Sequence, residues 1–404
     1  MASILRVATS AFTLTSTLLT FALVFSAGTT QSSGQCSIND LETSYPGPVA
    51  ADGWAYRLIA SDLSQPRGIL FNTEDALLVV EQGTGLVHLE FEDQGQTCLP
   101  VRRQTTLLEN EGLTHGIALS EDGRTLYAST QRDVYSWPYD PSGPSLSTTS
   151  RRTLVTNMGN PGSHSTRTLL LSRNHPDILV VSRGSDENED DGALDRSTGI
   201  SQIRAFNICA LINDDDSYDY TDGDLLGWGL RNSVGVGEHP ETGGIWSVEN
   251  SVDGLSPRGR DIHADNPAEE LNFHGYLNGS DANLGGNYGY PLCYRKLPKS
   301  GRPRDRLGNR EVPVGYDVSY VSFDNRRPSA PQDSTNATIS IIYNIDLSNC
   351  PSDCFRPVGL AWDSTGRLWL SSDSTGEIFV LNYEGNDSSD EGDNDGNGRG
   401  GRRQ

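Results

Sequence analysis

Short apolar runs alternate along the chain with clusters of Gly, Asp, Asn and Ser, and long stretches with the apolar period of a helix are missing. Five segments share one pattern, in which an apolar strand, a polar turn containing Gly or Asp, and a second apolar strand follow one another. These segments are residues 66–83, 115–129, 167–184, 232–249 and 356–372. The recurrence predicts an internal repeat of hairpins that pack against one another.

The spacing of the repeats predicts the number of units. They start at residues 67, 115, 167, 232 and 356, so the steps are about 50–65 residues apart from one gap of 124. That gap has room for one further start near residue 294. We therefore predict an all-β fold, a six-bladed β-propeller.

The wide gap contains too few apolar residues for a whole blade. Residues 295–312 are basic and nearly devoid of apolar side chains. Residues 315–323 and 338–343 have the pattern of strands, which supply half a blade. One blade is therefore expected to be incomplete.

The two ends of the chain differ in composition from the repeats. An apolar run at residues 14–25 follows Arg6 and precedes small residues, which predicts a secretory signal peptide at residues 1–27. Residues 384–404 are mostly Gly, Asp, Asn and Arg and are expected to form a disordered tail. The propeller domain is predicted to span residues 36–383.

Cysteines and sequons agree with secretion into an extracellular, oxidising environment. Six cysteines are present, and Cys350 and Cys354 are close enough for a local disulfide bond, although six cysteines allow 15 pairings overall. Sequons at Asn278, Asn336 and Asn386 predict a glycoprotein. The net charge of −23 argues against nucleic acid and anionic membranes as partners.

Arginines open three of the predicted inner strands, whose ends converge on the propeller axis. They are Arg67, Arg231 and Arg356. Three guanidinium groups around one axis repel each other unless an anion lies between them, and each contact to a carboxylate contributes about 1.5–3 kcal/mol. An anionic ligand at the axis is one interpretation; pairing with the abundant Asp and Glu residues is the other.

Three of the seven histidines are better placed than the others: His115, His164 and His274. His115 opens a repeat, and His164 lies three residues before Arg167, where a neutral imidazole could accept a proton from a substrate hydroxyl. Four others lie in turns or polar stretches and are predicted to be surface residues: His88, His175, His239 and His263. The acidic segments 248–254 and 261–272 could provide oxygen ligands for calcium.

Several stretches together resemble the soluble quinoprotein sugar dehydrogenases, with the closer match to the fungal pyranose dehydrogenases that depend on pyrroloquinoline quinone (PQQ). The resemblance covers roughly residues 36–383. Its most specific stretches are residues 229–235, 248–253, 266–272, 285–291 and 355–362. The resemblance implies a six-bladed propeller that carries PQQ on its axis.

The resemblance also implies roles for individual residues. His164 matches the general base, which removes the proton of the anomeric hydroxyl while hydride passes to the quinone. Arg231 and Asn232 match the pair that contacts the quinone oxygens. Arg67 and Arg356 match arginines that face the PQQ carboxylates.

A calcium ion is implied as a second cofactor. The carbonyl groups of Ser251 and Val252, with the Asp253 carboxylate, match the calcium loop of the family. Calcium would polarise the quinone. The implied substrate is a pyranose or ketoaldose, and electrons would pass to a separate acceptor such as a cytochrome or a quinone.

One departure from the family concerns the incomplete blade. The family carries a His-containing segment after the Gly-Tyr-Pro stretch, and here a short basic stretch replaces it. Two alternatives to a PQQ enzyme therefore remain: a non-catalytic secreted propeller that binds carbohydrate or protein, and a calcium-dependent propeller hydrolase such as a lactonase. The three axial arginines argue against the hydrolase, because they would repel its cation.

Overall fold

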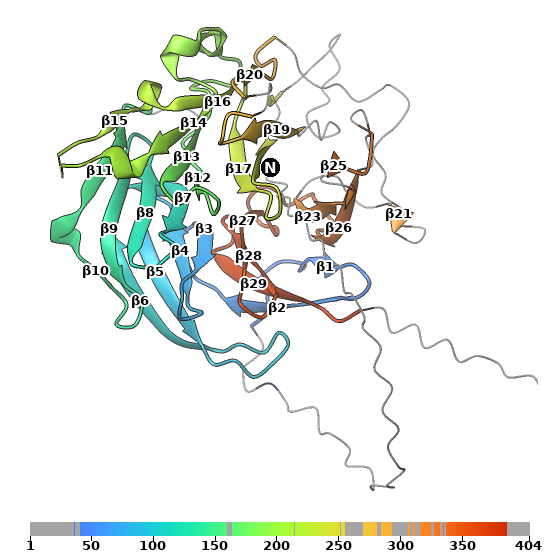
Figure 1. Cartoon of the computed structure of the whole chain (residues 1–404). Helices are drawn as coiled ribbons and strands as arrows, with labels where there is room; N and C mark the ends of the chain where they lie inside the picture. The colour runs from blue at the N-terminus through green and yellow to red at the C-terminus, as the bar shows by residue number, and fades with distance from the viewer. Residues whose placement is uncertain are drawn as a thin grey trace, which may run out of the picture.

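The computed structural model confirms an all-β, six-bladed β-propeller (Figure 1). It describes residues 36, 41–159, 164–213, 215–250, 252–254, 270–280, 284–292, 306–307, 310–311, 316–324, 327–331, 334 and 337–385. The predicted signal peptide, Ser251, His263 and residues 386–404 lie outside these ranges. Helical structure in the described ranges is limited to short 3-10 turns: η1 (Thr148–Ser150), η2 (Asp191–Leu194), η3 (Arg196–Thr198), η4 (Ile208–Ala210) and η5 (Tyr220–Asp222). None of these turns has the length or hydropathy of a membrane span.

Blades I to III follow one another along the chain. Blade I consists of β3 (Pro66–Phe71), β4 (Leu77–Glu81), β5 (Gly85–Phe91) and β6 (Val101–Glu109). Blade II consists of β7 (Leu113–Leu119), β8 (Thr125–Thr130), β9 (Val134–Asp140), β10 (Ser145–Leu146), β11 (Arg152–Thr156) and β15 (Tyr218–Asp219). Blade III consists of β12 (Leu169–Leu171), β13 (Ile178–Arg183), β14 (Gln202–Asn207), β16 (Asp224–Trp228) and β20 (Gly286–Asn287).

Blades IV to VI complete the ring. Blade IV consists of β17 (Ser233–Glu238), β18 (Gly244–Glu249) and β19 (Glu270–Tyr276). Blade V consists of β23 (Asp317–Val321), β26 (Thr338–Tyr343) and β1 (Val49–Ala50). Blade VI consists of β27 (Pro357–Trp362), β28 (Leu368–Ser372), β29 (Glu377–Tyr383) and β2 (Trp54–Ala60). Two small hairpins pair β21 (Arg306–Leu307) with β22 (Arg310–Glu311), and β24 (Phe323–Asp324) with β25 (Arg327–Pro328).

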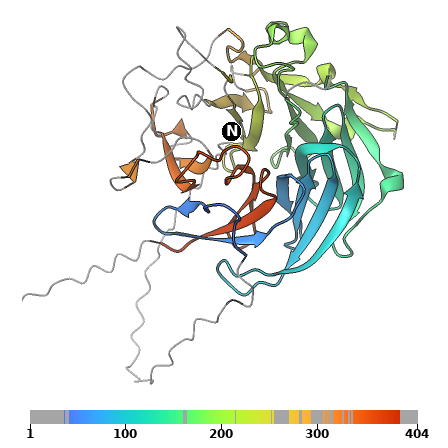
Figure 2. The same ribbon diagram turned by 180° about the vertical axis from the view of Figure 1, so that it is seen from behind.

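All five predicted hairpins are the first two strands of a blade. They form blades I, II, III, IV and VI, and each is an antiparallel pair. The two strands predicted after the wide gap are β23 and β26. The ring closes where the early strand β2 pairs with the late strand β29, which lie side by side in both views (Figure 2).

Glycines on inner strands let neighbouring blades approach each other closely. The Gly359 amide donates to Ser371 Oγ at 2.9 Å, and that hydroxyl donates to the Arg67 carbonyl of the next blade at 2.6 Å. A Cβ atom at Gly359 would lie 2.1 Å from the same carbonyl. Gly116 and Ser129 of blade II repeat this arrangement with the Arg167 carbonyl of blade III. A side chain at either glycine would therefore push two blades apart.

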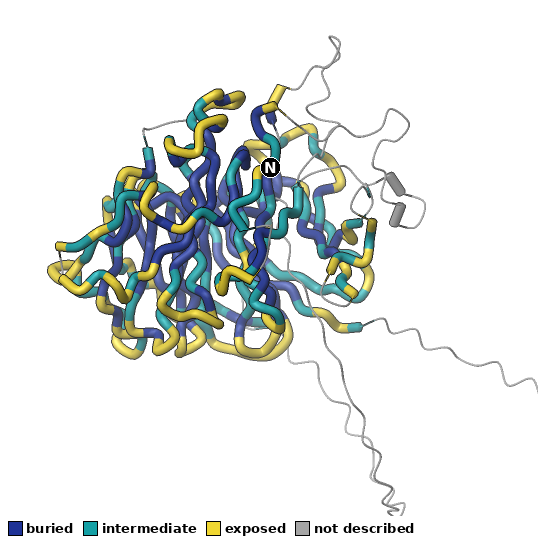
Figure 3. Tube along the Cα trace, turned by 45° about the horizontal axis from the view of Figure 1, so that its top comes forward, coloured by how far each residue is buried: buried dark blue, intermediate teal, exposed yellow. Residues whose placement is uncertain are grey.

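Apolar cores fill five of the six interfaces between blades. These clusters join blades VI and I, I and II, II and III, III and IV, and V and VI. The burial pattern shows buried strands enclosed by exposed turns (Figure 3). Between blades IV and V, the described residues form no such cluster; Phe323 contacts Trp246 there, with ring centroids 5.3 Å apart. Blade V has only two strands of its own among the described residues, which agrees with the predicted incomplete blade.

Two histidines predicted to be on the surface are buried. His88 on β5 is 1% exposed, and its Nε2 lies 3.3 Å from Asn72 Nδ2. His239 is 4% exposed, and its Nδ1 accepts the backbone amide hydrogens of Glu241 and Thr242. These two predictions were wrong, since a polar sequence context does not say which face of a strand or turn is covered. His175 is exposed, as predicted.

Candidate functional site

The starts of the inner strands bring the predicted arginines and His164 into one continuous set of contacts. Arg67 Nη2 donates to Thr166 Oγ1 at 3.4 Å, two residues beyond His164. His164 Nδ1 lies 2.9 Å from the Ser185 carbonyl, and the Ser185 amide donates to the Arg231 carbonyl at 2.8 Å. The residues come from blades I, III and IV, so the propeller axis is where they meet.

Asp373 binds two of the predicted arginines. Arg67 Nη1 donates to Asp373 Oδ2 at 2.7 Å, and Arg356 Nε donates to Oδ1 at 2.5 Å. The Asp373 side chain is 4% exposed. Burial lowers the pKa of Arg67; Asp373 opposes this shift and Arg356 adds to it. The arginines therefore do pair with an acidic residue, as the alternative interpretation stated. However, the single Asp373 carboxylate binds two guanidinium groups, so a net positive charge remains.

Arg231 forms a second charged group on the other side of the site. Its Nη2 donates to Asp253 Oδ2 at 2.9 Å and to Asn188 Oδ1 at 2.7 Å. Asn188 Nδ2 in turn donates to the Asp253 carbonyl at 2.8 Å. The Arg231 side chain is 6% exposed, whereas that of Asp253 is 65% exposed. Arg231 is therefore buried and bound by Asn188 and Asp253, and the Asp253 side chain is exposed to solvent.

Asn232 follows Arg231, and its side-chain amide lies close to His164. Its backbone amide donates to Glu249 Oε2 at 3.0 Å. Its side-chain Oδ1 is buried and has no partner among the described residues. A Cβ atom at Gly184 would lie 2.7 Å from that Oδ1 and 2.9 Å from the Cβ of His164. The glycine thus lets the amide and the imidazole lie next to each other.

The hydrogen bonds of His164 determine which ring nitrogen can act as a base. Nδ1 lies 2.9 Å from both the carbonyl and the hydroxyl oxygen of Ser185, and that hydroxyl donates to the Glu187 carbonyl. Because both Ser185 oxygens act as acceptors, Nδ1 carries the hydrogen and Nε2 is the basic nitrogen. Burial lowers the pKa of His164 to about 4, and the charge of Arg231 adds to this shift. The ring is therefore neutral near pH 7.

Arg167 anchors the segment that carries His164. It is fully buried, and its guanidinium donates to the His164 carbonyl at 2.8 Å and to the Met158 carbonyl at 3.0 Å. These bonds tie both ends of the segment to the start of the third inner strand. His164 is therefore part of a fixed backbone.

The described residues do not assemble the predicted calcium site. No three His, Cys, Asp or Glu side chains in this part of the chain gather as metal ligands. Ser251 lies outside the described ranges, and Val252 is buried against Ala193 and Tyr290. The Asp253 carboxylate is engaged by Arg231. Calcium at residues 251–253 stays a prediction.

A cavity of about 650 Å³ is lined by Gly68 and Val358, which lie one and two residues after Arg67 and Arg356. The inner strands β3, β7, β12, β17 and β27 line it, and its residues are mostly apolar. His115 lines its wall, as predicted for the axis. Burial lowers the pKa of His115 to about 3, and Arg67 adds to the shift, so this imidazole is also neutral.

Sequence reasoning missed several residues of the site. Asp373 and Ser185 each come one or two residues after the second strand of a repeat, a position that could have identified them. Asn188 lies in a loop and carries no such signal. The interactions of all three cross between segments that are far apart in the sequence.

Comparisons with known proteins found similar sequences and structures. A family model described as TrAA12-like matches residues 48–306 and 307–384. A PQQ-dependent sugar dehydrogenase of Hypocrea jecorina is 44% identical over 429 aligned positions, which cover 94% of this chain and 98% of the relative. Since 429 exceeds the 404 residues of this chain, the relative has positions that this chain lacks.

A PQQ-dependent pyranose dehydrogenase of Coprinopsis cinerea is 32% identical over 402 positions. The alignment covers 82% of this chain and 54% of that relative, so this chain spans about half of the relative's length.

Solved structures agree with these matches. The calcium structure of a Trichoderma reesei protein of Carbohydrate-Active Enzymes family AA12 has a TM-score of 0.79 and 45% identity, over 85% of this chain and 99% of that one. The holo PQQ domain of the Coprinopsis cinerea pyranose dehydrogenase has a TM-score of 0.73 and 29% identity, over 84% and 98%.

Proposed function

Since this chain belongs to the TrAA12-like family, we propose that it is a PQQ-dependent oxidoreductase that oxidises a sugar. The observation that carries the proposal is that Ser185 links a neutral His164 to Arg231, while Thr166, two residues beyond His164, accepts from Arg67. Arg67, Arg231 and Arg356 are together called the well. We propose further that the substrate is a pyranose or ketoaldose oxidised at its anomeric hydroxyl, and that electrons leave to a separate acceptor such as a cytochrome or a quinone.

The residues of the well fit PQQ, an ortho-quinone with three carboxylates. Three guanidinium groups share two carboxylates, so the well retains a positive charge. Arg67 Nε and Asn232 Oδ1 are buried without a partner among the described residues, and the terminal nitrogens of Arg356 make no hydrogen bond there. Arg67 and Arg356 would hold carboxylates of the cofactor, and Arg231 and Asn232 its quinone oxygens.

The chain's own residues supply the proton chemistry. PQQ, when bound, would supply the acceptor for the two electrons that leave the sugar as a hydride. The hydroxyl of the sugar loses its proton to His164 Nε2, because Nδ1 is occupied as a donor to Ser185. Arg231 favours the neutral ring before the reaction. Arg167 and Ser185 keep the ring in place.

Calcium and secretion complete the proposal. Calcium would be held at Ser251, Val252 and Asp253; the described residues provide no full ligand set, so no step is assigned to the ion. Disulfide bonds Cys36–Cys98 and Cys350–Cys354 support an oxidising, extracellular environment. Asn278, one of the three sequons, lies in an exposed turn.

A non-catalytic propeller is the second candidate. The incomplete blade V favours it, because the interface between blades IV and V lacks an apolar core among the described residues. Such a protein would keep the fold and lose turnover.

One titration separates the two candidates. The purified protein is titrated with PQQ, with and without calcium, and then assayed for reduction of a dye by a panel of sugars. Saturable PQQ binding followed by sugar-dependent reduction supports the enzyme. PQQ binding without turnover supports the second candidate, and no PQQ binding at all would overturn the cofactor assignment.

A further inference from the structure

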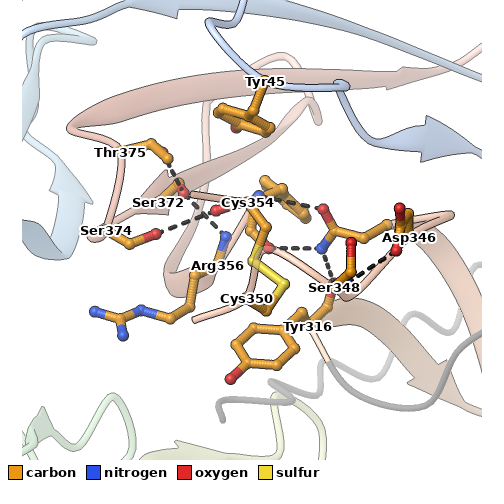
Figure 4. Close-up of a disulfide and its surroundings, with 12 residues drawn as sticks. Tyr45, Tyr316, Asp346, Ser348, Cys350, Cys354, Arg356, Ser372, Ser374 and Thr375 are labelled. Carbon is orange, nitrogen blue, oxygen red and sulfur yellow. Dashed lines mark hydrogen bonds between the residues drawn. A yellow bond between two sulfur atoms is a disulfide. The ribbon is translucent and has the colours of Figure 1, made fainter. Parts of the chain in front are cut away.

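Tyr316 is the residue through which the incomplete blade reaches the site. It directly precedes β23 and has a left-handed backbone, with φ 53°. Asn344 Nδ2 donates to the Tyr316 carbonyl at 2.9 Å and to the Phe355 carbonyl at 2.7 Å, and Asn344 Oδ1 accepts the Phe355 amide. One side chain thus holds Tyr316 beside the residue that precedes Arg356 (Figure 4).

The Tyr316 side chain extends in the same direction as that of Arg356, from the neighbouring stretch of backbone (Figure 4). Burial raises the pKa of Tyr316; the Arg356 charge opposes this shift, and the Asp253 and Asp373 carboxylates add to it. Asp373 belongs to the pair of arginines from blades I and VI, whereas Asp253 is bound to Arg231 of blade IV. The ring is half-buried, and its hydroxyl makes no hydrogen bond within the described residues.

Core packing does not account for this position. The apolar cluster between blades V and VI contains Tyr45, Tyr56 and Tyr320, whereas Tyr316 is not part of it. A non-glycine residue in the left-handed region costs about 1 kcal/mol, and such residues persist where the surroundings hold them, often at functional sites. Asn344 provides that support here.

We propose that Tyr316 forms one wall of the sugar-binding subsite. The inference rests on the proposed function and names the contact that selects the substrate. A phenol offers an apolar face to the C–H groups of a pyranose ring and a hydroxyl that donates to or accepts from the sugar hydroxyls. The arginines match an anion, whereas a neutral phenol matches an uncharged polyol. The incomplete blade therefore contributes directly to the site.

Three variants of the full-length, PQQ-loaded protein test this assignment. Tyr316→Ala should raise the KM for the sugar about tenfold while the Kd for PQQ stays within about twofold. Tyr316→Phe retains the apolar face and should raise KM by only about threefold. Tyr320→Ala, on the same blade but in the core, should lower the unfolding midpoint and leave KM unchanged.

Equilibrium sugar binding, measured by saturation-transfer NMR on the same proteins, decides the inference even if the wild-type protein has no turnover. Weaker sugar binding by Tyr316→Ala supports the subsite in that case, although the proposed activity would then be wrong. Unchanged KM and unchanged sugar binding would overturn the subsite. A tenfold loss of PQQ affinity with unchanged sugar affinity would overturn it as well, since Tyr316 would then contact the cofactor (~1.4 kcal/mol per tenfold change).

Discussion

Replacing Asp373 with asparagine removes the carboxylate that binds Arg67 and Arg356 while nearly preserving the volume of the side chain. Two guanidinium groups would then face each other with no negative charge between them. Each hydrogen bond to a charged group contributes about 1.5–3 kcal/mol, and breaking a buried ion pair costs about 3–5 kcal/mol.

The exposure of the partners sets the expected size of the effect. Asp373 is 4% exposed and Arg67 17%, whereas Arg356 is 31% exposed and can regain hydration. We therefore expect Asp373→Asn to lower the free energy of unfolding of the cofactor-free protein by about 2–4 kcal/mol.

Urea unfolding followed by tryptophan fluorescence measures this loss. Trp369 is fully buried on β28, four residues before Asp373, and reports on the same blade. Glu90→Gln is the matched control, because Glu90 pairs with Arg102 and Arg103, whose side chains are 65% and 58% exposed. The control should cost less than about 1 kcal/mol and should lose its effect at high salt, unlike the buried pair. A loss below about 0.5 kcal/mol for Asp373→Asn would refute the reasoning.

Three further predictions concern the base, a blade interface and the core. His164→Asn should lower kcat about 10²–10⁴-fold and leave the affinity for PQQ unchanged. The neutral ring is the base and its pKa is about 4, so kcat/KM of the wild-type protein should stay level from about pH 7 to pH 5 and fall below pH 4. A decline of kcat/KM already at pH 6.5 would contradict the assignment. Gly359→Ala should destabilise the fold by several kcal/mol, because the new Cβ atom would meet the Arg67 carbonyl; an unchanged melting temperature would contradict that close approach. Trp137→Ala, at a fully buried position between blades I and II, should cost about 3–5 kcal/mol in urea unfolding, and a smaller loss would mean that the cavity collapses.

The hairpins could be predicted from the sequence because their signals are local. Alternate residues such as Ile117 and Leu119 pack on one face of a strand, and turn residues such as Asp122 and Gly123 reverse the chain within a few positions. Cys350 and Cys354 form the disulfide bond that their short spacing predicted. His88 was assigned incorrectly because its burial depends on blade packing, which its neighbours in sequence do not encode.

The amino-acid sequence by itself determined the repeat, the all-β class and the arginines and histidine at the starts of the inner strands, since these depend on periodicity and short spacings. Only the tertiary structure decided that Arg67 meets Asp373, 306 residues away, and that Asn344 holds Tyr316 next to Phe355. Closure of the ring by β2 and β29 brings such residues together, and contacts across a closed ring have no fixed distance along the chain.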